Sequence, residues 1–305
     1  MPQAVRVLSS DDVALQFEQA LAIDPSLWGK AWRVRMLHHP PIIHFDRPTR
    51  TSPVSLTGSS CALQCAHCGG HYLQHMQPIW HVNADGATSC LISGGCDRAG
   101  RVPVTSHMEV VARLRRGRRL NWHVGLIQEE ELQAIAPFVD VISFDIVGDA
   151  ETAREVYGLD LTLDDYLRTF DLLRRYAPVV PHLTIGLRGG RLSGERAALG
   201  ALATRKLEAL IFIVLIPTAG TTFAHCAPPA LHEVARLLLE ARITFPDTRL
   251  LLGCMRPHGI YRQMLDELAV RVGLNGVVNP TLNAERAADR LGLQVTWGEE
   301  CCALP

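Results

Sequence analysis

The sequence predicts an α/β protein that folds as a (β/α)8 TIM-type barrel, closed or partly open, with an N-terminal helical extension. The chain has 305 residues, of which 48% are hydrophobic and 20% charged, so it can bury a large core. From residue 54 onward, short apolar runs alternate with amphipathic segments of helix length, eight times at about 30 residues per unit. This alternation is typical of a parallel sheet whose strands are joined by helices. Eight units fit a barrel of this length; an open barrel of six strands is the alternative, because the last two units have the weakest pattern.

The predicted elements follow one another without a second domain. Strands are expected at residues 54–57, 89–93, 120–124, 139–146, 179–185, 210–216, 249–252 and 276–278. Helices are expected at residues 108–115, 129–138, 163–176, 194–204, 229–243, 259–272 and 282–291. Residues 1–50 lie outside this alternation, with a helix start at Ser9-Ser10-Asp11-Asp12 and then a proline-rich, extended stretch. We therefore expect an extension over residues 1–50, a barrel over 51–292 and a cysteine-containing tail over 293–305.

Charge and hydropathy exclude two classes of partner. Lys+Arg total 30 and Asp+Glu total 31, a net charge of −1, whereas a nucleic-acid groove needs a marked basic excess. The longest uninterrupted apolar run, residues 209–216, has the length of a strand and is too short to cross a bilayer. The first 25 residues carry Asp11, Asp12, Glu18 and Asp24 and lack the basic n-region of a signal peptide. We expect a cytoplasmic protein that binds neither nucleic acid nor membrane.

Three of the nine cysteines fall within eight residues, directly after the first predicted strand. Cys61, Cys65 and Cys68 have the spacing C-x3-C-x2-C, and the end of a barrel strand lies at the catalytic mouth. In a reducing compartment such a group indicates a metal centre or catalysis before disulfides. Three thiolates can hold three irons of a [4Fe–4S] cluster and leave the fourth iron open to a substrate or cofactor. The alternative is a zinc site that takes His71 or His75 as its fourth ligand.

This triplet, on the loop after the first strand, resembles the cysteine motif of the radical S-adenosylmethionine (SAM) superfamily. In that family the fourth iron binds the amino and carboxylate groups of SAM, and reductive cleavage yields a 5′-deoxyadenosyl radical, so the cofactor supplies the hard chemistry. The resemblance implies a [4Fe–4S] cluster, SAM and an electron donor such as ferredoxin or flavodoxin. It also implies that His67, between the second and third cysteines, lies next to the adenine, where the family usually has an aromatic residue.

The second predicted strand ends in a glycine pair that resembles the Gly-Gly-Glu motif of the same family. The segment is Ser93-Gly94-Gly95-Cys96-Asp97, and glycine here lets the backbone approach a ligand closely. The family's motif meets the SAM amino group, so the resemblance implies SAM binding at Ser93, Gly94 and Gly95. Cys96 replaces the glutamate, and Asp97 is the nearest acidic substitute.

Polar residues lie at the carboxyl ends of the later predicted strands, at the same end of the barrel as the cysteine triplet. His123 lies in the third strand, Asp145 in the fourth, and Arg188 follows the fifth. An unpaired carboxylate inside a barrel is costly, so Asp145 needs a ligand or a partner such as Arg188 or His123. In radical SAM enzymes these positions commonly hold the ribose, the carboxylate or the substrate, and the resemblance implies that all three residues bind SAM. The alternative is an internal pair between Asp145 and one of the other two.

Longer stretches within residues 50–305 resemble the biotin synthase-related group and, within it, the second subunit of the split, two-protein lipoyl synthases. The stretches are residues 93–98, 143–148, 215–221 and 253–257, with Glu300-Cys301-Cys302 at the end. The resemblance implies a sulfurtransferase that inserts sulfur into an octanoyl chain on a lysine of a lipoyl carrier protein, together with a homologous partner subunit. Two alternatives stay open: a biotin synthase-like enzyme with another task, such as metallocofactor maturation or methylation, and a barrel that binds a cluster or zinc without catalysis.

Sulfur insertion needs a sulfur source, which in this chemistry is normally a sacrificed auxiliary iron–sulfur cluster. Cys254, after the seventh predicted strand, and Cys301 and Cys302, in the tail, are the candidate ligands. Residues 1–50 contain no cysteine, whereas single-chain lipoyl synthases use an N-terminal triplet. Either these three cysteines form a second site, or the partner subunit supplies the sulfur. A frayed tail with incidental cysteines is the third interpretation.

Overall fold

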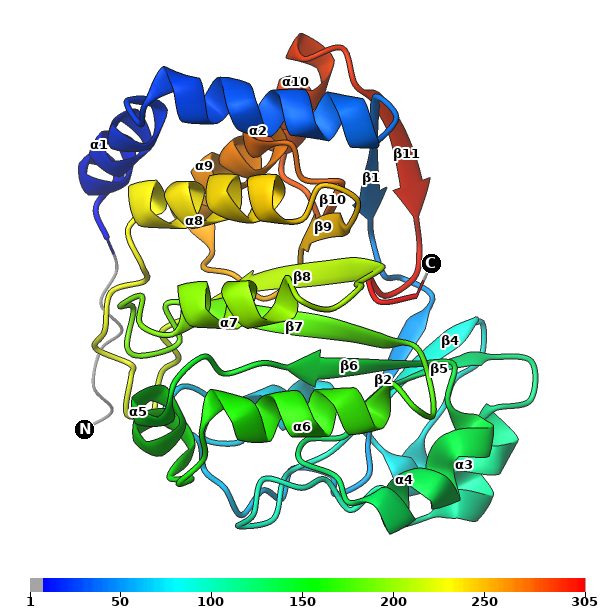
Figure 1. Ribbon diagram of the computed structural model, residues 1–305. Helices are drawn as coiled ribbons and strands as arrows, with labels where there is room; N and C mark the ends of the chain where they lie inside the picture. The colour runs from blue at the N-terminus through cyan, green and yellow to red at the C-terminus, as the bar shows by residue number, and fades with distance from the viewer. Residues whose placement is uncertain (1–7, 305) are drawn as a thin grey trace.

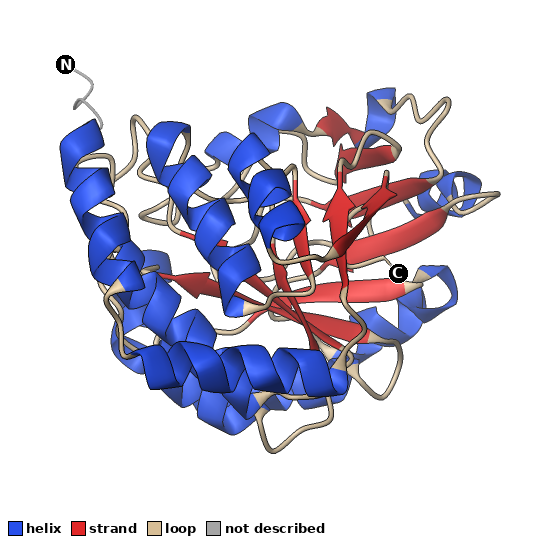
Figure 2. Ribbon diagram, turned by 90° about the horizontal axis from the view of Figure 1, so that it is seen from above, coloured by secondary structure: helices blue, strands red, loops and turns tan. Residues whose placement is uncertain are grey.

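One parallel sheet forms the wall of the molecule, and helices cover its outer side (Figure 1, Figure 2). The computed structural model describes residues 8–304. The strands are β1 (Ile42–Asp46), β2 (Thr51–Ser55), β3 (Gln77–Pro78), β4 (Ser89–Ser93), β5 (Arg119–His123), β6 (Val141–Asp145), β7 (Val179–Ile185), β8 (Ala209–Val214), β9 (Arg249–Leu252), β10 (Gly276–Val278) and β11 (Gln294–Gly298). Their order in the sheet is β11-β1-β10-β9-β8-β7-β6-β5-β4-β2-β3. Among the described residues no pairing joins β3 to β11, so the wall stays open there. The predicted α/β barrel is confirmed in its partly open form.

All eight predicted strands occur, as β2 and β4 to β10, and three more join them. β1 pairs in parallel with both β10 and β11, so that Phe45 lies opposite Val277 and Trp297. The segments on either side of residues 51–292 thus each supply a strand to the sheet, β1 from the first and β11 from the last. The physical reason is burial: Ile43 and Phe45 are fully buried in the sheet, and the prolines flank this strand instead of extending through it. Residues 1–7 and 305 of those two segments lie outside the described residues.

The seven predicted helices all form, the N-terminal segment holds two more, and a short helix after β6 makes the tenth of the described chain. The α-helices are α1 (Ser10–Leu21), α2 (Pro25–His38), α3 (Met108–Leu114), α4 (Glu129–Ile135), α5 (Ala150–Thr152), α6 (Leu163–Leu173), α7 (Glu195–Leu202), α8 (Leu231–Thr244), α9 (Gly259–Val272) and α10 (Leu282–Arg290). The short turns are η1 (His71–His75), η2 (Ile79–His81), η3 (Ala136–Phe138) and η4 (Ala153–Tyr157). α1 begins where predicted, because the Ser9 side chain accepts a hydrogen bond from Asp12 N. Between β2 and β4 the described chain has only η1, β3 and η2, so the first unit lacks its α-helix and carries the cysteine loop instead.

The C-terminal tail packs inside the barrel. Ala303 and Leu304 are buried in a small apolar cluster with Val141, Val180, Ala209, Ile211 and Leu251 from the inner face of the sheet. Glu300 holds the tail at the amino ends of the strands, because its carboxylate accepts hydrogen bonds from Thr88 and Ser89 and lies 3.3 Å from Thr51 Oγ1. The described tail is therefore ordered by burial and is not frayed. No helix in the described part of the chain is long and apolar enough to cross a membrane.

Candidate active site

The cysteine triplet lies on the loop that leaves the carboxyl end of β2. A backbone hydrogen bond of 3.0 Å from Cys68 N to Cys65 O folds the end of this loop into a tight turn. Burial raises the pKa of the Cys65 thiol well above its ordinary value, and the neighbouring thiols of Cys61, Cys68 and Cys96 raise it further. The three predicted cluster ligands therefore lie together, and a fourth cysteine lies beside them.

Gly95, the second glycine after β4, packs directly against the cysteine loop. A Cβ atom added at Gly95 would lie 1.9 Å from Ser60 O and 2.6 Å from Cys61 Cα, closer than any real contact. Gly95 N also donates a hydrogen bond of 2.7 Å to Thr57 Oγ1, whereas a Cβ at Gly94 would come only within 3.3 Å of Thr57. Glycine is required at position 95 because the loop touches it. The close approach of a ligand at Gly95 stays a prediction, and the loop contact is a second reason for glycine there.

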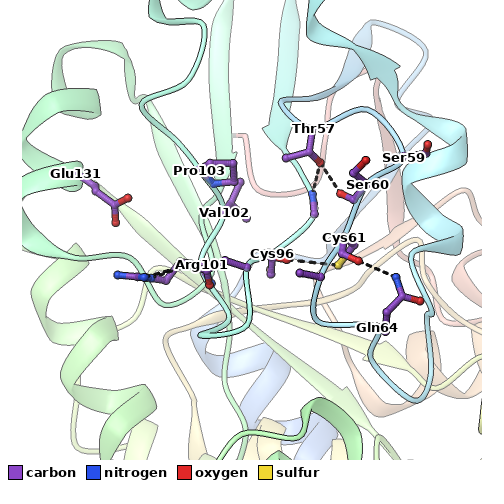
Figure 3. A pocket seen from close by; sticks show the side chains of 13 residues that line it. Thr57, Ser59, Ser60, Cys61, Gln64, Cys96, Arg101, Val102, Pro103 and Glu131 are labelled. Carbon is purple, nitrogen blue, oxygen red and sulfur yellow. Dashed lines mark hydrogen bonds and ion pairs between the residues drawn. The ribbon is translucent and has the colours of Figure 1, made fainter.

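Cys96 and Asp97 follow the glycine pair at a cavity of about 690 Å³ that Cys61 also lines (Figure 3). The Asp97 carboxylate accepts hydrogen bonds from Ala99 N (2.8 Å), Arg101 N (3.0 Å) and Arg101 Nε (3.1 Å). Burial acts to raise the pKa of Asp97, but these bonds from Arg101 and Ala99 hold it below its ordinary value. The Asp97 carboxylate is already hydrogen-bonded within its own turn, so it is a poor substitute for the motif's glutamate.

His67 packs beside two tyrosine rings. Its ring lies 5.8 Å from the ring of Tyr157, edge to face, and 6.2 Å from that of Tyr72. Burial lowers the pKa of His67 to about 4, although the nearby carboxylate of Asp145 acts to raise it. The ring is therefore neutral at pH 7, and its Nδ1 atom is buried without a hydrogen-bond partner among the described residues. A ligand could supply that partner.

Asp145 and His123 meet at the inner face of the sheet, as the internal-pair alternative expected. His123 Nε2 lies 3.5 Å from Asp145 Oδ2, and the His123 ring is 6.0 Å from that of His182. Burial lowers the pKa of His182 to about 4. The second oxygen, Asp145 Oδ1, is buried without a partner in the described chain. A buried carboxylate oxygen with no donor is costly, which indicates that a donor on a ligand completes the pair.

Two residues predicted to bind SAM make other contacts. The Arg188 guanidinium pairs with Glu155 (Nε to Oε2, 2.6 Å) and with Glu151, not with Asp145. These two acids lie on α5 and η4, which the sequence pattern did not predict, so the partner of Arg188 could not be foreseen. Ser93 Oγ donates a hydrogen bond of 3.1 Å to the backbone oxygen of His123 and ties β4 to β5. Both residues shape the mouth through the protein itself.

Among residues 8–304, no three His, Cys, Asp or Glu side chains converge as ligands of one metal ion. The zinc alternative needs such convergence with His71 or His75, and those two rings instead pack edge to face against each other at 5.5 Å. A [4Fe–4S] cluster gives each thiolate its own iron, so Cys61, Cys65 and Cys68 can surround it without meeting at one point.

A second thiol group lies inside the barrel and joins residues far apart in sequence. The Cys301 and Cys302 side chains are hydrogen-bonded to each other, and this bond lowers the pKa of Cys301 to about 7. The same bond, followed by burial and the Cys301 and Cys254 thiols, raises the pKa of Cys302. Asn121 Nδ2 donates a hydrogen bond of 3.4 Å to Cys301 Sγ. Cys301 and Cys302 thus lie against each other, and the exposed Cys254 is near enough to act on the pKa of Cys302.

A series of polar contacts on the inner face links this second group to the mouth. Cys301 contacts Asn121 on β5, and Asn121 Oδ1 accepts a hydrogen bond of 3.0 Å from Ser143 Oγ on β6. Two residues further along the same strands, and so on the same face, lie His123 and Asp145. Cys301 is therefore linked through Asn121 and Ser143 to the strands that carry His123 and Asp145. The link through Asn121 was missed by the sequence analysis, because it depends on where the tail enters.

Comparisons with known proteins bear on the fold. No protein-family model and no curated protein matches the chain. Among solved structures, the crystal structure of methylornithine synthase (PylB) is similar, with a TM-score of 0.63, 13% sequence identity and coverage of 95% of both chains. Dihydropteroate synthase of Yersinia pestis, in a sulfonamide drug complex, has a TM-score of 0.35 and 12% identity over 81% of this chain and 94% of its own, which is too weak to carry an argument. The first likeness extends over almost the whole chain and confirms its fold.

Proposed function

We propose that the chain is a radical SAM enzyme whose [4Fe–4S] cluster is held by Cys61, Cys65 and Cys68. The observation that carries this proposal is the shared site of the three thiols, at the carboxyl end of a partly open parallel barrel. Three thiolates bind three irons, and the fourth iron stays available to SAM. When bound, the cluster and SAM together supply a 5′-deoxyadenosyl radical, which abstracts hydrogen from carbon.

The chain's own residues would hold SAM at the mouth and protect the reaction from solvent. The neutral His67 ring offers a flat, partly apolar face, which suits a purine. Two buried atoms without partners, His67 Nδ1 and Asp145 Oδ1, would take hydrogen bonds from the ligand. His123, 3.5 Å from Asp145, would keep the carboxylate oriented.

The substrate we propose is an octanoyl chain on a lysine of a lipoyl carrier protein, with sulfur as the inserted atom. The second thiol group supports this proposal, because Cys301 and Cys302 pack against the inner face of the sheet and the Cys254 thiol is near enough to raise the pKa of Cys302. A substrate carbon held between the two groups could lose hydrogen toward the mouth and take up sulfur from the other side. We propose an auxiliary iron–sulfur cluster on these three cysteines, and a homologous partner subunit and a ferredoxin or flavodoxin as the other components.

The test is anaerobic incubation of the reconstituted protein with SAM, a reductant, an octanoyl-lysyl peptide and the partner subunit, followed by mass spectrometry. The expected product carries added sulfur and appears together with 5′-deoxyadenosine. The matched control is Cys302→Ser, which should still cleave SAM but leave the peptide without sulfur. SAM cleavage with no change in the peptide, in the wild-type protein, would direct the search to another substrate, such as one for metallocofactor maturation or methylation.

A further inference from the structure

A fourth cysteine, Cys96, lies beside Cys61 at the mouth of the barrel. The backbone oxygen of Cys96 accepts a hydrogen bond of 2.8 Å from Ala62 N and lies 3.9 Å from Cys61 Sγ. Gly95, one residue earlier, is in direct contact with the backbone of Cys61. The cysteine loop and the turn after β4 are therefore fixed to each other, and Cys96 and Cys61 line the same cavity (Figure 3).

The Cys96 thiol has no hydrogen-bond partner among the described residues, and its surroundings are crowded with groups that carry or can take negative charge. Burial, followed by the Cys61 thiol, Asp97, Asp145 and the Cys68 thiol, raises the pKa of Cys96 to about 12. The thiol therefore lies without a partner at the cavity that Cys61 also lines, where it is available as a ligand. Asp97 cannot take that place, because its carboxylate is bound to its own turn.

We infer that Cys96 is the fourth ligand of the cluster when SAM is absent, so that the resting cluster is held by four thiolates. This inference rests on the proposed function. When Cys96 binds, its S–H proton leaves to solvent and an iron–sulfur bond forms. When the SAM amino and carboxylate groups take that iron, the bond to Cys96 breaks and the thiolate takes up a proton. No electron moves in this exchange.

Two expected results distinguish Cys96 as a cluster ligand from Cys96 as a residue that only contacts SAM. A cluster with one open iron loses that iron on mild oxidation more readily than a cluster with four thiolate ligands. Binding of Cys96 to the fourth iron should therefore protect the resting cluster against loss of that iron on oxidation. It should also weaken SAM binding, because SAM must displace a thiolate. A Cys96 side chain that only touched SAM would strengthen SAM binding and would leave the resting cluster unprotected.

The experiment compares the full-length wild-type protein with Cys96→Ala and with the shape-conserving Cys96→Ser, each reconstituted anaerobically with iron and sulfide. Cys90→Ala is the control, because Cys90 is a fully buried thiol on β4. Each protein is titrated with ferricyanide without SAM, and the three-iron cluster is measured by electron paramagnetic resonance. SAM affinity is measured separately by equilibrium binding. Iron at the second thiol group is common to all four proteins and cancels in the comparison.

We expect severalfold more three-iron cluster, and tighter SAM binding, in both Cys96 variants than in the wild-type and Cys90→Ala proteins. Equal three-iron yields in all four proteins, or weaker SAM binding in Cys96→Ser, would overturn the inference but leave the proposed function intact. Failure of the folded wild-type protein to assemble any four-iron cluster would overturn both.

Discussion

At Gly95 the backbone after β4 touches the cysteine loop so closely that no Cβ atom fits. We predict that Gly95→Val loses cluster assembly and SAM binding together, because the new side chain must push Ser60 and Cys61 away. Iron content and SAM binding of the reconstituted variant measure this loss. Gly200→Ala in α7 is the control, since a Cβ at Gly200 meets nothing within 4 Å and should leave both properties unchanged. A Gly95→Val protein with a full cluster and weakened SAM binding alone would show that ligand space, not loop contact, requires the glycine.

His182 gives the stability of the chain a dependence on pH that can be isolated. Its pKa is lowered by burial to about 4, below the ordinary value of 6.5, so the unfolded chain takes up a proton first as pH falls. The contribution of neutral His182 to the free energy of unfolding is fully present above pH 6.5 and is lost as the pH falls from about 6.5 to 4. We predict that wild-type protein loses on the order of 1–2 kcal/mol more than His182→Asn between pH 7 and pH 5. Urea unfolding at the two pH values tests this, and equal losses in both proteins would contradict it.

The strands and helices show what the sequence could and could not predict. The eight strands with strong apolar runs and the seven amphipathic helices were all predicted, because each carries its own periodicity. β1 and β11 were missed: β1 is five residues between prolines, and β11 has only partly buried or exposed residues. These two strands are specified by pairing with each other and with β10, which no local pattern reveals. α5 and η4 were missed for the same reason, and with them the partners of Arg188.

The tail after β11 is an element whose removal separates the two proposed chemistries. A cut after Gly298 keeps every pairing of β11 with β1 and removes Glu300, Cys301 and Cys302. We predict that this shortened chain still cleaves SAM, loses the iron in excess of one cluster and no longer inserts sulfur. Iron analysis, 5′-deoxyadenosine and peptide mass spectrometry measure the three properties.

A matched variant keeps this prediction testable if the shortened chain is unstable after losing the buried Ala303 and Leu304. Cys301→Ser with Cys302→Ser retains the tail and should give the same three results. If either protein keeps all its iron and still inserts sulfur, the tail is not a cluster ligand and the sulfur comes from the partner subunit.

Over the whole molecule, the barrel brings together residues that the sequence keeps apart. The triplet and its spacing were visible in the sequence, and the parallel barrel placed it at the carboxyl ends of the strands. The meeting of Cys254 with Cys301 and Cys302 was only a candidate, because it depends on how the tail enters the interior past Thr51, Thr88 and Ser89. The position of Cys96 beside the cysteine loop could not be predicted from the sequence either, because it depends on contact between the loops after β2 and β4.

The central claim, that the triplet generates a radical from SAM, is tested most directly by 5′-deoxyadenosine. The protein is reconstituted anaerobically, mixed with SAM and dithionite, and analysed by liquid chromatography and mass spectrometry. The account predicts that wild-type protein and Cys90→Ala form 5′-deoxyadenosine, and that Cys61→Ala, Cys65→Ala and Cys68→Ala each fall to the background without protein, because each lacks one iron ligand. Full 5′-deoxyadenosine formation by any of these three variants, or none by a wild-type protein that holds its cluster, would contradict it.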